Sequence, residues 1–356
     1  MERSRVHPSK SRAAAVEDLR VLKAAVSQQS PSSDFAPVTL SELEAAAALV
    51  HSVMPPTPLL AWPKLARRSG CRVYVKHENH TPAGAFKVRG GLVYMDRLKR
   101  EQPQVPGVIS ATRGNHGQSI AFAASRNGIP AIIYVPKGNS PDQNSAIAAF
   151  GATVVEFGKD FDEAKHEAYR VAAEKGLHLI PSFHRNLVVG VGTYALEMFR
   201  AVNDLDAVYV GVGMGSGICG LISARDALGL ETEIIGCGPF NAPATALSFA
   251  AGKVTNSASA NTFADGLATR EPNSQAIDII CRGVARFVQV TEDEIAAAIR
   301  FYFDDTHHVA EGAGAAPLAA LLKDAERMQG KKVGLVLSGG NIERARYLKV
   351  LLGETP

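Results

Sequence analysis

The sequence predicts an α/β protein built on parallel sheet. Short apolar segments that suit strands alternate with helical segments from about Val38 to Leu352, and strands of a parallel sheet read as continuous apolar runs because both faces are covered. Several of these strands end in glycine-rich turns, where open α/β sheets bind their ligands. The 356 residues are 46% hydrophobic and 21% charged, which is enough for one large domain or two lobes.

The first predicted elements follow local signals. Thr39 and Ser41, with acidic residues close behind them, start a helix through Ala45–Val53, and a group of prolines stops it. Arg72–Lys76 alternates polar and apolar residues like a strand.

The middle of the chain repeats the strand–helix unit. The predicted strands are Gly107–Ser110, Ala131–Val135, Thr153–Phe157 and Leu177–Ile180, and the helices between them are Asn115–Asn127, Ser140–Phe150 and Phe161–Lys175. The pattern resumes with strands Ala207–Val212, Glu233–Cys237 and Lys332–Leu337 and with the helix Ile218–Leu228. We therefore predict a small inserted α/β domain at 106–184 and a large domain formed by 37–105 and 185–356.

Composition argues against several classes of protein. The 38 basic and 35 acidic residues give a net charge of +3, so no nucleic-acid partner is expected. No run of about 18 uncharged apolar residues exists, so no membrane partner is expected either. The four cysteines are dispersed, which fits a cytoplasmic protein and not a disulfide framework or a zinc knuckle.

The N-terminal segment 1–36 differs from the rest of the chain. It is basic at first and then polar, and no apolar core like that of a secretory signal follows. Its arginine, serine and alanine content also fits a transit peptide, but Glu17 and Asp18 follow closely. We prefer a flexible arm, with room for a short helix through Val16–Val26.

Lys87 lies in an apolar, glycine-flanked heptapeptide, Gly84–Gly90. Desolvation disfavours an ammonium group, so a lysine in this setting suits a nucleophile that attacks a carbonyl. The alternative is an ordinary surface lysine whose stem covers apolar neighbours.

The segment Gly211–Gly217 joins a predicted strand to a predicted helix. Its glycines allow close approach of an anion to the free N–H groups of the helix, which predicts a phosphate site. Close helix–strand packing is one alternative and a dinucleotide site is another. The dinucleotide fingerprint requires an acid at the end of the next strand, and Ile234–Pro239 has none, so a single phosphate fits better.

Two further strand-end turns carry polar residues. In Ser110–Gly117, helix N–H groups could bind a carboxylate and Asn115 could bind an oxygen, whereas the alternatives make Thr112 or Asn115 a helix cap and His116 part of a satisfied polar network. In Leu337–Asn341, the hydroxyl of Ser338 could hold a ring nitrogen without protonating it, or the segment is a plain turn.

These motifs occur in the order found in one family. From about Val38 to Leu352 the chain resembles the fold-type II pyridoxal-phosphate enzymes, and within them the serine/threonine dehydratase and serine racemase group. Flanking motifs that share the likeness are Pro56–Leu59, Lys76–Asn79, Ala264–Ala268 and Ala310–Ala315. The resemblance implies a fold like that of the tryptophan synthase β chain, with two open, twisted, mostly parallel sheets flanked by helices.

The resemblance also implies roles for individual residues. Lys87 would form a Schiff base with pyridoxal 5'-phosphate and act as base, and Thr112 would place a hydroxyl opposite it. The cofactor would be bound by Phe86, Lys87, Asn115, Gly213, Met214, Gly215, Ser216, Gly217, Glu311 and Ser338. The carboxylate of the substrate would be bound by Ala111, Thr112, Arg113, Gly114, Asn115 and His116.

The implied activity is that of an ammonia-lyase (dehydratase). Water would be eliminated from a 3-hydroxy amino acid such as L-threonine or L-serine, giving a 2-oxo acid and ammonia. The alternatives are an amino-acid racemase, a β-replacement synthase, a dehydratase for an acidic substrate such as 3-hydroxyaspartate, or an inactive or nucleotide-binding α/β protein. Relatives often form homodimers. The chain ends soon after Gly340, which leads us to expect no regulatory domain and a catabolic role.

Three single positions and one stretch depart from the usual pattern of these relatives. Ala83 and Ala85 replace hydroxyl residues near the expected phosphate, and Arg113 replaces a small residue. We expect Arg113 either to face solvent or to bind an extra carboxylate of the substrate. The stretch Gly238–Ala244 lacks the two acids that bind a divalent cation in several relatives, so we expect no metal and no need for magnesium there.

Overall fold

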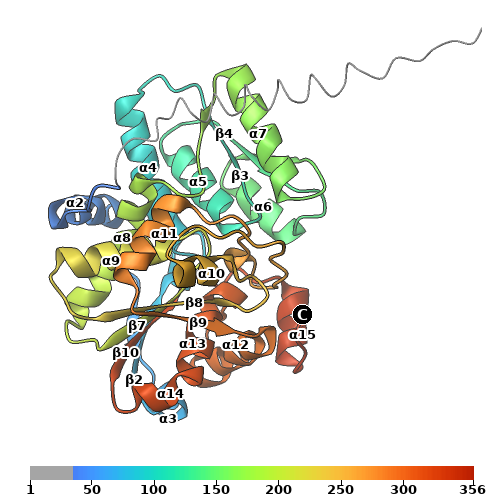
Figure 1. Cartoon of the computed structure of the whole chain (residues 1–356). Helices are drawn as coiled ribbons and strands as arrows, with labels where there is room; N and C mark the ends of the chain where they lie inside the picture. Colours follow the sequence, from blue (N-terminus) through green and yellow to red (C-terminus); the bar gives the residue numbers. More distant parts are fainter. Residues whose placement is uncertain (1–34) are drawn as a thin grey trace, which may run out of the picture.

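Two separate β-sheets with helices packed around them form the described part of the chain, residues 35–356 of a computed structural model (Figure 1). The larger sheet has the strand order β1-β2-β10-β7-β8-β9, and the smaller has the order β5-β4-β3-β6. The strands are β1 (Leu59–Ala61), β2 (Arg72–His77), β3 (Val108–Ala111), β4 (Ala131–Val135), β5 (Thr153–Glu156), β6 (His178–Leu179), β7 (Ala207–Gly211), β8 (Glu233–Pro239), β9 (Arg286–Val290) and β10 (Lys332–Leu337).

Helices surround both sheets. They are α2 (Leu40–His51), α3 (Pro63–Ser69), α4 (Lys87–Glu101), α5 (Asn115–Arg126), α6 (Pro141–Ala149), α7 (Phe161–Lys175), α8 (Arg185–Ala201), α9 (Ser216–Ala227), α10 (Ala244–Ala251), α11 (Ser274–Gly283), α12 (Glu292–Thr306), α13 (Gly312–Lys323), α14 (Ala325–Met328) and α15 (Arg344–Leu351), with short 3-10 turns η1 (Glu78–His80) and η2 (Asp265–Leu267). In Figure 1 the smaller sheet lies above the larger one, with α5, α6 and α7 around it.

Every strand pair is parallel except β1 with β2. The C-terminal strand β10 lies between β2 and β7, pairing Lys332 with Arg72 and Val333 with Ala207. The carboxyl ends of β2, β10 and β7 therefore lie at one edge of the sheet. This order brings the turn after β10 between the segment that follows β2 and the turn after β7.

Both faces of each sheet are covered, which explains the continuous apolar runs of the strands. In the smaller sheet Ile109 packs in a cluster with residues of α7, whereas its neighbour Val108 packs in a cluster with residues of α5. In the larger sheet Tyr209 packs with residues of α12 and α13, whereas Val208 packs with residues of α8 and α9.

Helices α4, α8 and α9 pack unusually closely. A Cβ added at Gly190 of α8 would lie 2.4 Å from the carbonyl oxygen of Arg89 in α4, and one added at Gly220 of α9 would lie 2.8 Å from the backbone nitrogen of Gly192. Larger residues at these glycines would push the helices apart. The close contact holds the start of α4 and the start of α9 near each other, and these are the segments that carry Lys87 and the glycine turn.

Most elements agree with the sequence-based expectations. The strands at 131–135 and 332–337 and the helix at 161–175 have the predicted bounds, and Thr39 caps α2 together with Glu42 in a reciprocal capping box. Strands β1 and β9 were not predicted. The expected fold, two mostly parallel sheets flanked by helices, is confirmed.

The proposed domain division follows the sheets. All four strands of the smaller sheet come from the proposed small domain 106–184, and all strands of the larger sheet come from outside it. The proposed arm 1–36, including the helix at 16–26, lies almost wholly outside the described residues. Within residues 35–356, no helix has both the length and the apolar character needed to cross a bilayer.

Candidate active site

The segment before α4 and the turn after β10 are joined by backbone hydrogen bonds. The N–H of Phe86 donates to the carbonyl oxygen of Ser338 at 2.9 Å, and the N–H of Gly340 donates to that of Gly84 at 3.0 Å. Ala85 and Gly339 form an isolated antiparallel bridge between them. Two motifs about 250 positions apart in the sequence thus form one surface.

The glycine turn between β7 and α9 lies against Phe86. A Cβ added at Gly217 would lie 3.4 Å from the ring of Phe86, and the hydroxyl of Tyr194 donates to the carbonyl oxygen of Gly217 at 2.9 Å. Gly215, at a φ of 101°, caps α9 without a side-chain hydrogen bond to the helix N–H groups. These N–H groups, together with the partial positive charge of the helix N-terminus, suit a phosphate.

Packing also explains two of the glycines in this turn. A Cβ at Gly213 would lie 2.3 Å from the carbonyl oxygen of Gly266, and one at Gly215 would lie 2.7 Å from Cβ of Ala276. Packing against η2 and α11 therefore also favours glycine at these two positions. A Cβ at Gly217 would make only ordinary van der Waals contacts, so packing within residues 35–356 does not explain why glycine occupies this position.

Lys87 is the first residue of α4 and is partly buried. Its Nζ lies 5.0 Å from the centroid of the Phe86 ring, and its carbonyl oxygen accepts a hydrogen bond from the hydroxyl of Ser119 at 2.6 Å. Burial lowers the pKa of Lys87, and the nearby carboxylate of Glu311 opposes this shift. A lowered pKa increases the fraction of neutral amine, which is the nucleophilic form.

Three polar side chains from separate segments form a chain of hydrogen bonds beside Lys87. The amide of Asn115 donates to both carboxylate oxygens of Glu311 at 2.8 and 3.0 Å, and the amide of Asn341 donates to Oδ1 of Asn115 at 2.8 Å. Burial raises the pKa of Glu311 to about 7, although the hydrogen bonds from Asn115 act in the opposite direction. Glu311 therefore changes its charge near neutral pH.

The structure shows neither of the two alternatives expected for the turn before α5, a side-chain helix cap and a satisfied polar network. Gly114 is the N-cap of α5, with no side-chain capping bond, so neither Thr112 nor Asn115 caps the helix. The Thr112 hydroxyl accepts a hydrogen bond from the N–H of Gly114 at 3.1 Å instead. His116 is not in a satisfied polar network, because its buried Nε2 has no partner among residues 35–356. Burial, followed by the charge of Lys87, lowers the pKa of His116 to about 3, so its imidazole is neutral.

The remaining predicted residues lie around this centre. Ala111 is buried at the end of β3, Ser216 is buried at the start of α9, and Met214 is partly exposed. Ser338 is 7% exposed, and its hydroxyl has no hydrogen-bond partner among residues 35–356. Arg113 is exposed and forms no ion pair within residues 35–356.

These residues fit a pyridoxal-phosphate group. The chemistry of the donor set supplies an amine of lowered pKa at Lys87, uncapped helix N–H groups at Gly215 and an unpartnered hydroxyl at Ser338. The buried unpartnered Nε2 of His116 is a further polar atom that a ligand could satisfy. Neither of the cation-binding acids of some relatives is present at Gly238–Ala244.

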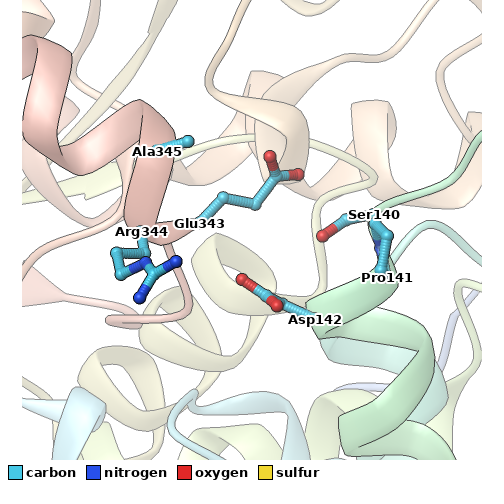
Figure 2. Close-up of a pocket in the computed structure, with 6 residues that line it drawn as sticks. All are labelled: Ser140, Pro141, Asp142, Glu343, Arg344 and Ala345. Carbon is cyan, nitrogen blue, oxygen red and sulfur yellow. The ribbon is translucent and has the colours of Figure 1, made fainter.

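A hollow of about 490 Å³ lies beside the site, between the first residues of α6 and α15. Figure 2 shows Asp142 of α6 and Glu343 and Arg344 near the start of α15 pointing into it. Gln143, the residue after Asp142, donates a hydrogen bond to the carbonyl oxygen of Asn341 at 3.0 Å. The hollow therefore lies next to residues that contact the hydrogen-bond chain of the site.

Sequence reasoning missed three residues whose hydrogen bonds position the segments of the site. Asn341 was noted only as part of a turn, yet it links Asn115 to the carbonyl oxygen of Ala83 at 2.8 Å. The hydroxyl of Tyr194 donates to the carbonyl oxygen of Gly217, and that of Ser119 donates to the carbonyl oxygen of Lys87. Asn341 had a detectable signal, because an amide directly after a strand-end glycine pair is placed to reach a neighbouring loop. Tyr194 and Ser119 lie inside helices and had none.

The raised pKa of Glu311 predicts an unusual dependence of stability on pH. Between its ordinary value of 4.5 and about 7, the folded protein holds a proton on Glu311 that the unfolded chain has lost. Its contribution to the free energy of unfolding therefore falls as pH rises through this range. We expect Glu311→Gln, which cannot ionise, to raise the Tm of the cofactor-free protein by a few °C more at pH 8 than at pH 5, given roughly 2–4 °C per kcal/mol.

The matched control is Glu271→Gln, which changes an exposed carboxylate. Thermal melts of both variants and the parent across pH check the expectation. If Tm of Glu311→Gln stays parallel to that of the parent at every pH, Glu311 does not titrate with a raised pKa.

Comparison with known proteins gives a consistent result. Residues 51–339 match the family described as "Pyridoxal-phosphate dependent enzyme". The L-threonine ammonia-lyase of Thermotoga maritima is 34% identical over 86% of this chain and 76% of its own length. The L-threo-3-hydroxyaspartate ammonia-lyase of Saccharomyces cerevisiae is 31% identical over 84% of this chain and 91% of its own length. The structure of maize serine racemase is similar with a TM-score of 0.83 at 27% identity, covering 89% of this chain and 97% of that one.

Proposed function

The chain belongs to the pyridoxal-phosphate-dependent enzyme family, and on that basis we propose that it is an ammonia-lyase acting on a 3-hydroxy amino acid. The products would be a 2-oxo acid and ammonia. The observation that carries this proposal is the partly buried Lys87, whose pKa is lowered where three strand-end turns meet. The relatives named as L-threonine ammonia-lyases, at up to 37% identity, support it.

Pyridoxal phosphate, when bound, supplies an aldehyde that captures amino groups and a conjugated ring that withdraws electrons from Cα. We propose that the glycine turn Gly213–Gly217 binds its phosphate and that Phe86 packs against its ring. Ser338 would contact the ring nitrogen through a neutral hydroxyl, and Asn115 would contact the ring oxygen.

Lys87 is the proposed base that removes the Cα proton. A base must be unprotonated to act, and burial lowers the pKa of this amine toward the working pH. Glu311 lies close enough to affect the charge of Lys87 and itself titrates at about pH 7. The two groups together can hold one proton near the reacting carbon over a range of pH.

The turn Ala111–His116 is the proposed binding site for the substrate carboxylate. The first N–H groups of α5 have no side-chain cap among the described residues, so an anion can accept from them. The neutral imidazole of His116, with its unpartnered nitrogen, can donate or accept one further hydrogen bond.

Racemisation is the second candidate, favoured by the similarity to maize serine racemase. A racemase must return a proton to the face of Cα opposite Lys87, and Thr112 carries the hydroxyl proposed for that face. That hydroxyl accepts a hydrogen bond from the N–H of Gly114, which leaves its own proton available for this step. Measuring 2-oxo acid and the mirror-image amino acid from L-serine and L-threonine separates the two activities, and inversion without 2-oxo acid would contradict the proposal.

Arg113 is the residue that we propose binds a second carboxylate group of the substrate. It is exposed on the turn that would bind the substrate, and it forms no ion pair within residues 35–356. We expect Arg113→Ala to lower kcat/KM for 3-hydroxyaspartate by about 10- to 100-fold, the usual value of a charge-assisted hydrogen bond, and to change that for threonine and serine little.

Arg126→Ala, at the other end of α5 and also exposed, is the matched control and should affect all three substrates equally little. Steady-state kinetics on the three substrates check this. Equal losses for all three substrates with Arg113→Ala would show that Arg113 reads no second carboxylate.

We also propose that the protein is a cytoplasmic homodimer with a catabolic role. All four cysteines of the chain are free thiols in the structure, which is compatible with a reducing compartment. The homodimer rests on the likeness to the family. Light scattering of the purified holoenzyme tests the dimer, and cell fractionation tests the location.

A further inference from the structure

Three histidines from two distant segments come together outside the candidate active site. His77 ends β2, His80 lies in η1, and His308 lies between α12 and α13. One ring nitrogen of each lies within 4.8 Å of the others. The ring centroids of His77 and His308 are 4.4 Å apart, and those of His80 and His308 are 5.0 Å apart.

The hydrogen bonds of these histidines leave ligand atoms free. His77 is fully buried, and its Nδ1 has no hydrogen-bond partner among residues 35–356. A buried polar atom without a partner is unfavourable, and a bound ligand would remove this cost. Nδ1 of His308 lies 2.8 Å from the carbonyl oxygen of Thr306, so its Nε2 is the ring nitrogen left for a ligand. An imidazole oriented by a backbone carbonyl in this way is typical of metal ligands.

The acidic residue that lies between two of these histidines in the sequence is bound elsewhere. The carboxylate nearest in sequence, Glu78, is held by Arg89 and Thr57, so it does not serve as a counter-ion here. Neutral imidazole is the form that binds metals.

We propose that His77, His80 and His308 form a binding site for a zinc ion. Three imidazole nitrogens suit zinc, whereas magnesium and calcium require oxygen ligands. Three protein ligands leave the fourth tetrahedral position to water. This site was not expected from the sequence, because His77 and His80 are separated from His308 by about 230 positions. It does not depend on the proposed lyase activity.

Trp62 provides a reporter for the site. Its indole N–H donates to Nε2 of His77 at 3.0 Å, and its ring lies edge-on to His308 at 5.4 Å. Without metal, His77 therefore carries its proton on Nδ1. Coordination through Nδ1 would move that proton to Nε2, facing the indole N–H, and coordination through Nε2 would displace the indole. In both cases Trp62 loses its hydrogen bond, and Trp62 is the single tryptophan of the chain.

The test uses the purified holoenzyme after treatment with a chelator, with zinc chloride as the only added metal. Zinc retained per chain after gel filtration is measured by mass spectrometry, and Trp62 fluorescence is followed during titration. We expect one zinc per chain and a saturable fluorescence change. His80→Ala and His308→Gln should weaken binding by more than the roughly 10- to 100-fold that loss of an outer-sphere partner costs.

His307→Asn is the matched control. His307 is exposed and adjacent to His308, and its left-handed φ of 56° suits asparagine. It should bind zinc like the parent. Because His80 is exposed, His80→Ala should fold normally, and an unchanged cofactor spectrum and melting curve verify this. The proposal is overturned if the parent binds no zinc, or if His80→Ala gives the same stoichiometry and fluorescence change as the parent.

Discussion

Lys87→Ala should lower the rate of 2-oxo acid release by about 10³-fold or more, because general acid–base groups contribute about 10²–10⁴-fold to catalysis and this lysine is also the proposed covalent attachment point. The loss should appear in kcat for every 3-hydroxy amino acid tested. The glycine turn Gly213–Gly217, which is the proposed phosphate site, is untouched by this change, so the variant should still bind the cofactor non-covalently. Stopped assays of 2-oxo acid with threonine and serine measure the effect.

Two control variants separate the chemistry of Lys87 from its charge. Lys87→Arg keeps a cation but cannot supply a neutral amine, so it should be as inactive as the alanine variant. Lys159→Ala removes an exposed lysine between β5 and α7 and should leave the rate unchanged. Borohydride reduction of the parent should attach the cofactor to residue 87, as located by peptide mass spectrometry. Full activity of Lys87→Ala, or attachment at another lysine, would overturn the assignment of the site.

Arg89→Met should lower the free energy of unfolding by about 3–5 kcal/mol, the usual cost of removing one partner from a buried ion pair. Arg89 is fully buried two residues after Lys87. Its guanidinium donates to Glu78 at 2.7 and 3.0 Å and to Glu197 at 2.6 and 2.9 Å. Methionine fills a similar volume but leaves both carboxylates without this partner, although Lys76 still contacts Glu197 at 2.5 Å.

The control for this prediction is Arg170→Met on the exposed face of α7. Arg170 also bridges two carboxylates, Glu167 and Glu174, but its side chain is 58% exposed. Solvent-exposed ion pairs contribute about 0–1 kcal/mol, so this variant should unfold at nearly the parent's urea midpoint. Similar midpoints for the two variants would show that the buried network adds no more than a surface pair. Because Arg89 lies on the first turn of α4, its loss should also reduce activity by displacing Lys87.

Local pattern was sufficient for much of the fold. Helix α7 and strand β4 have bounds that their periodicity and flanking turns define, and both were predicted. Strand β1 is only three residues long and largely exposed, so it has no apolar run to detect. Strand β9 is partly buried along most of its length, which weakens its pattern in the same way. Elements whose character depends on a neighbouring strand cannot be identified from their own residues.

The candidate site also combines features that local sequence reveals with features that depend on distant neighbours. Lys87, Ser338 and the glycine turn each have a chemistry that their neighbours in sequence reveal. The bonds from Asn115 to Glu311 and Asn341 join residues about 200 positions apart, and no local pattern contains them. The raised pKa of Glu311 arises from burial among those partners and has no counterpart in its own motif.

The amino-acid sequence by itself determined the α/β class, the order of the strand-end turns and the choice of Lys87 as the proposed nucleophile, because periodicity, glycine and a distinctive lysine motif act over a few residues. Only the tertiary structure decided which side chains share protons and which nitrogens are left without partners. Strand order places β10 between β2 and β7, and that placement brings distant loops together. Desolvation and hydrogen bonding depend on such neighbours in space, so the charge of Glu311 and the grouping of His77, His80 and His308 emerge only after folding.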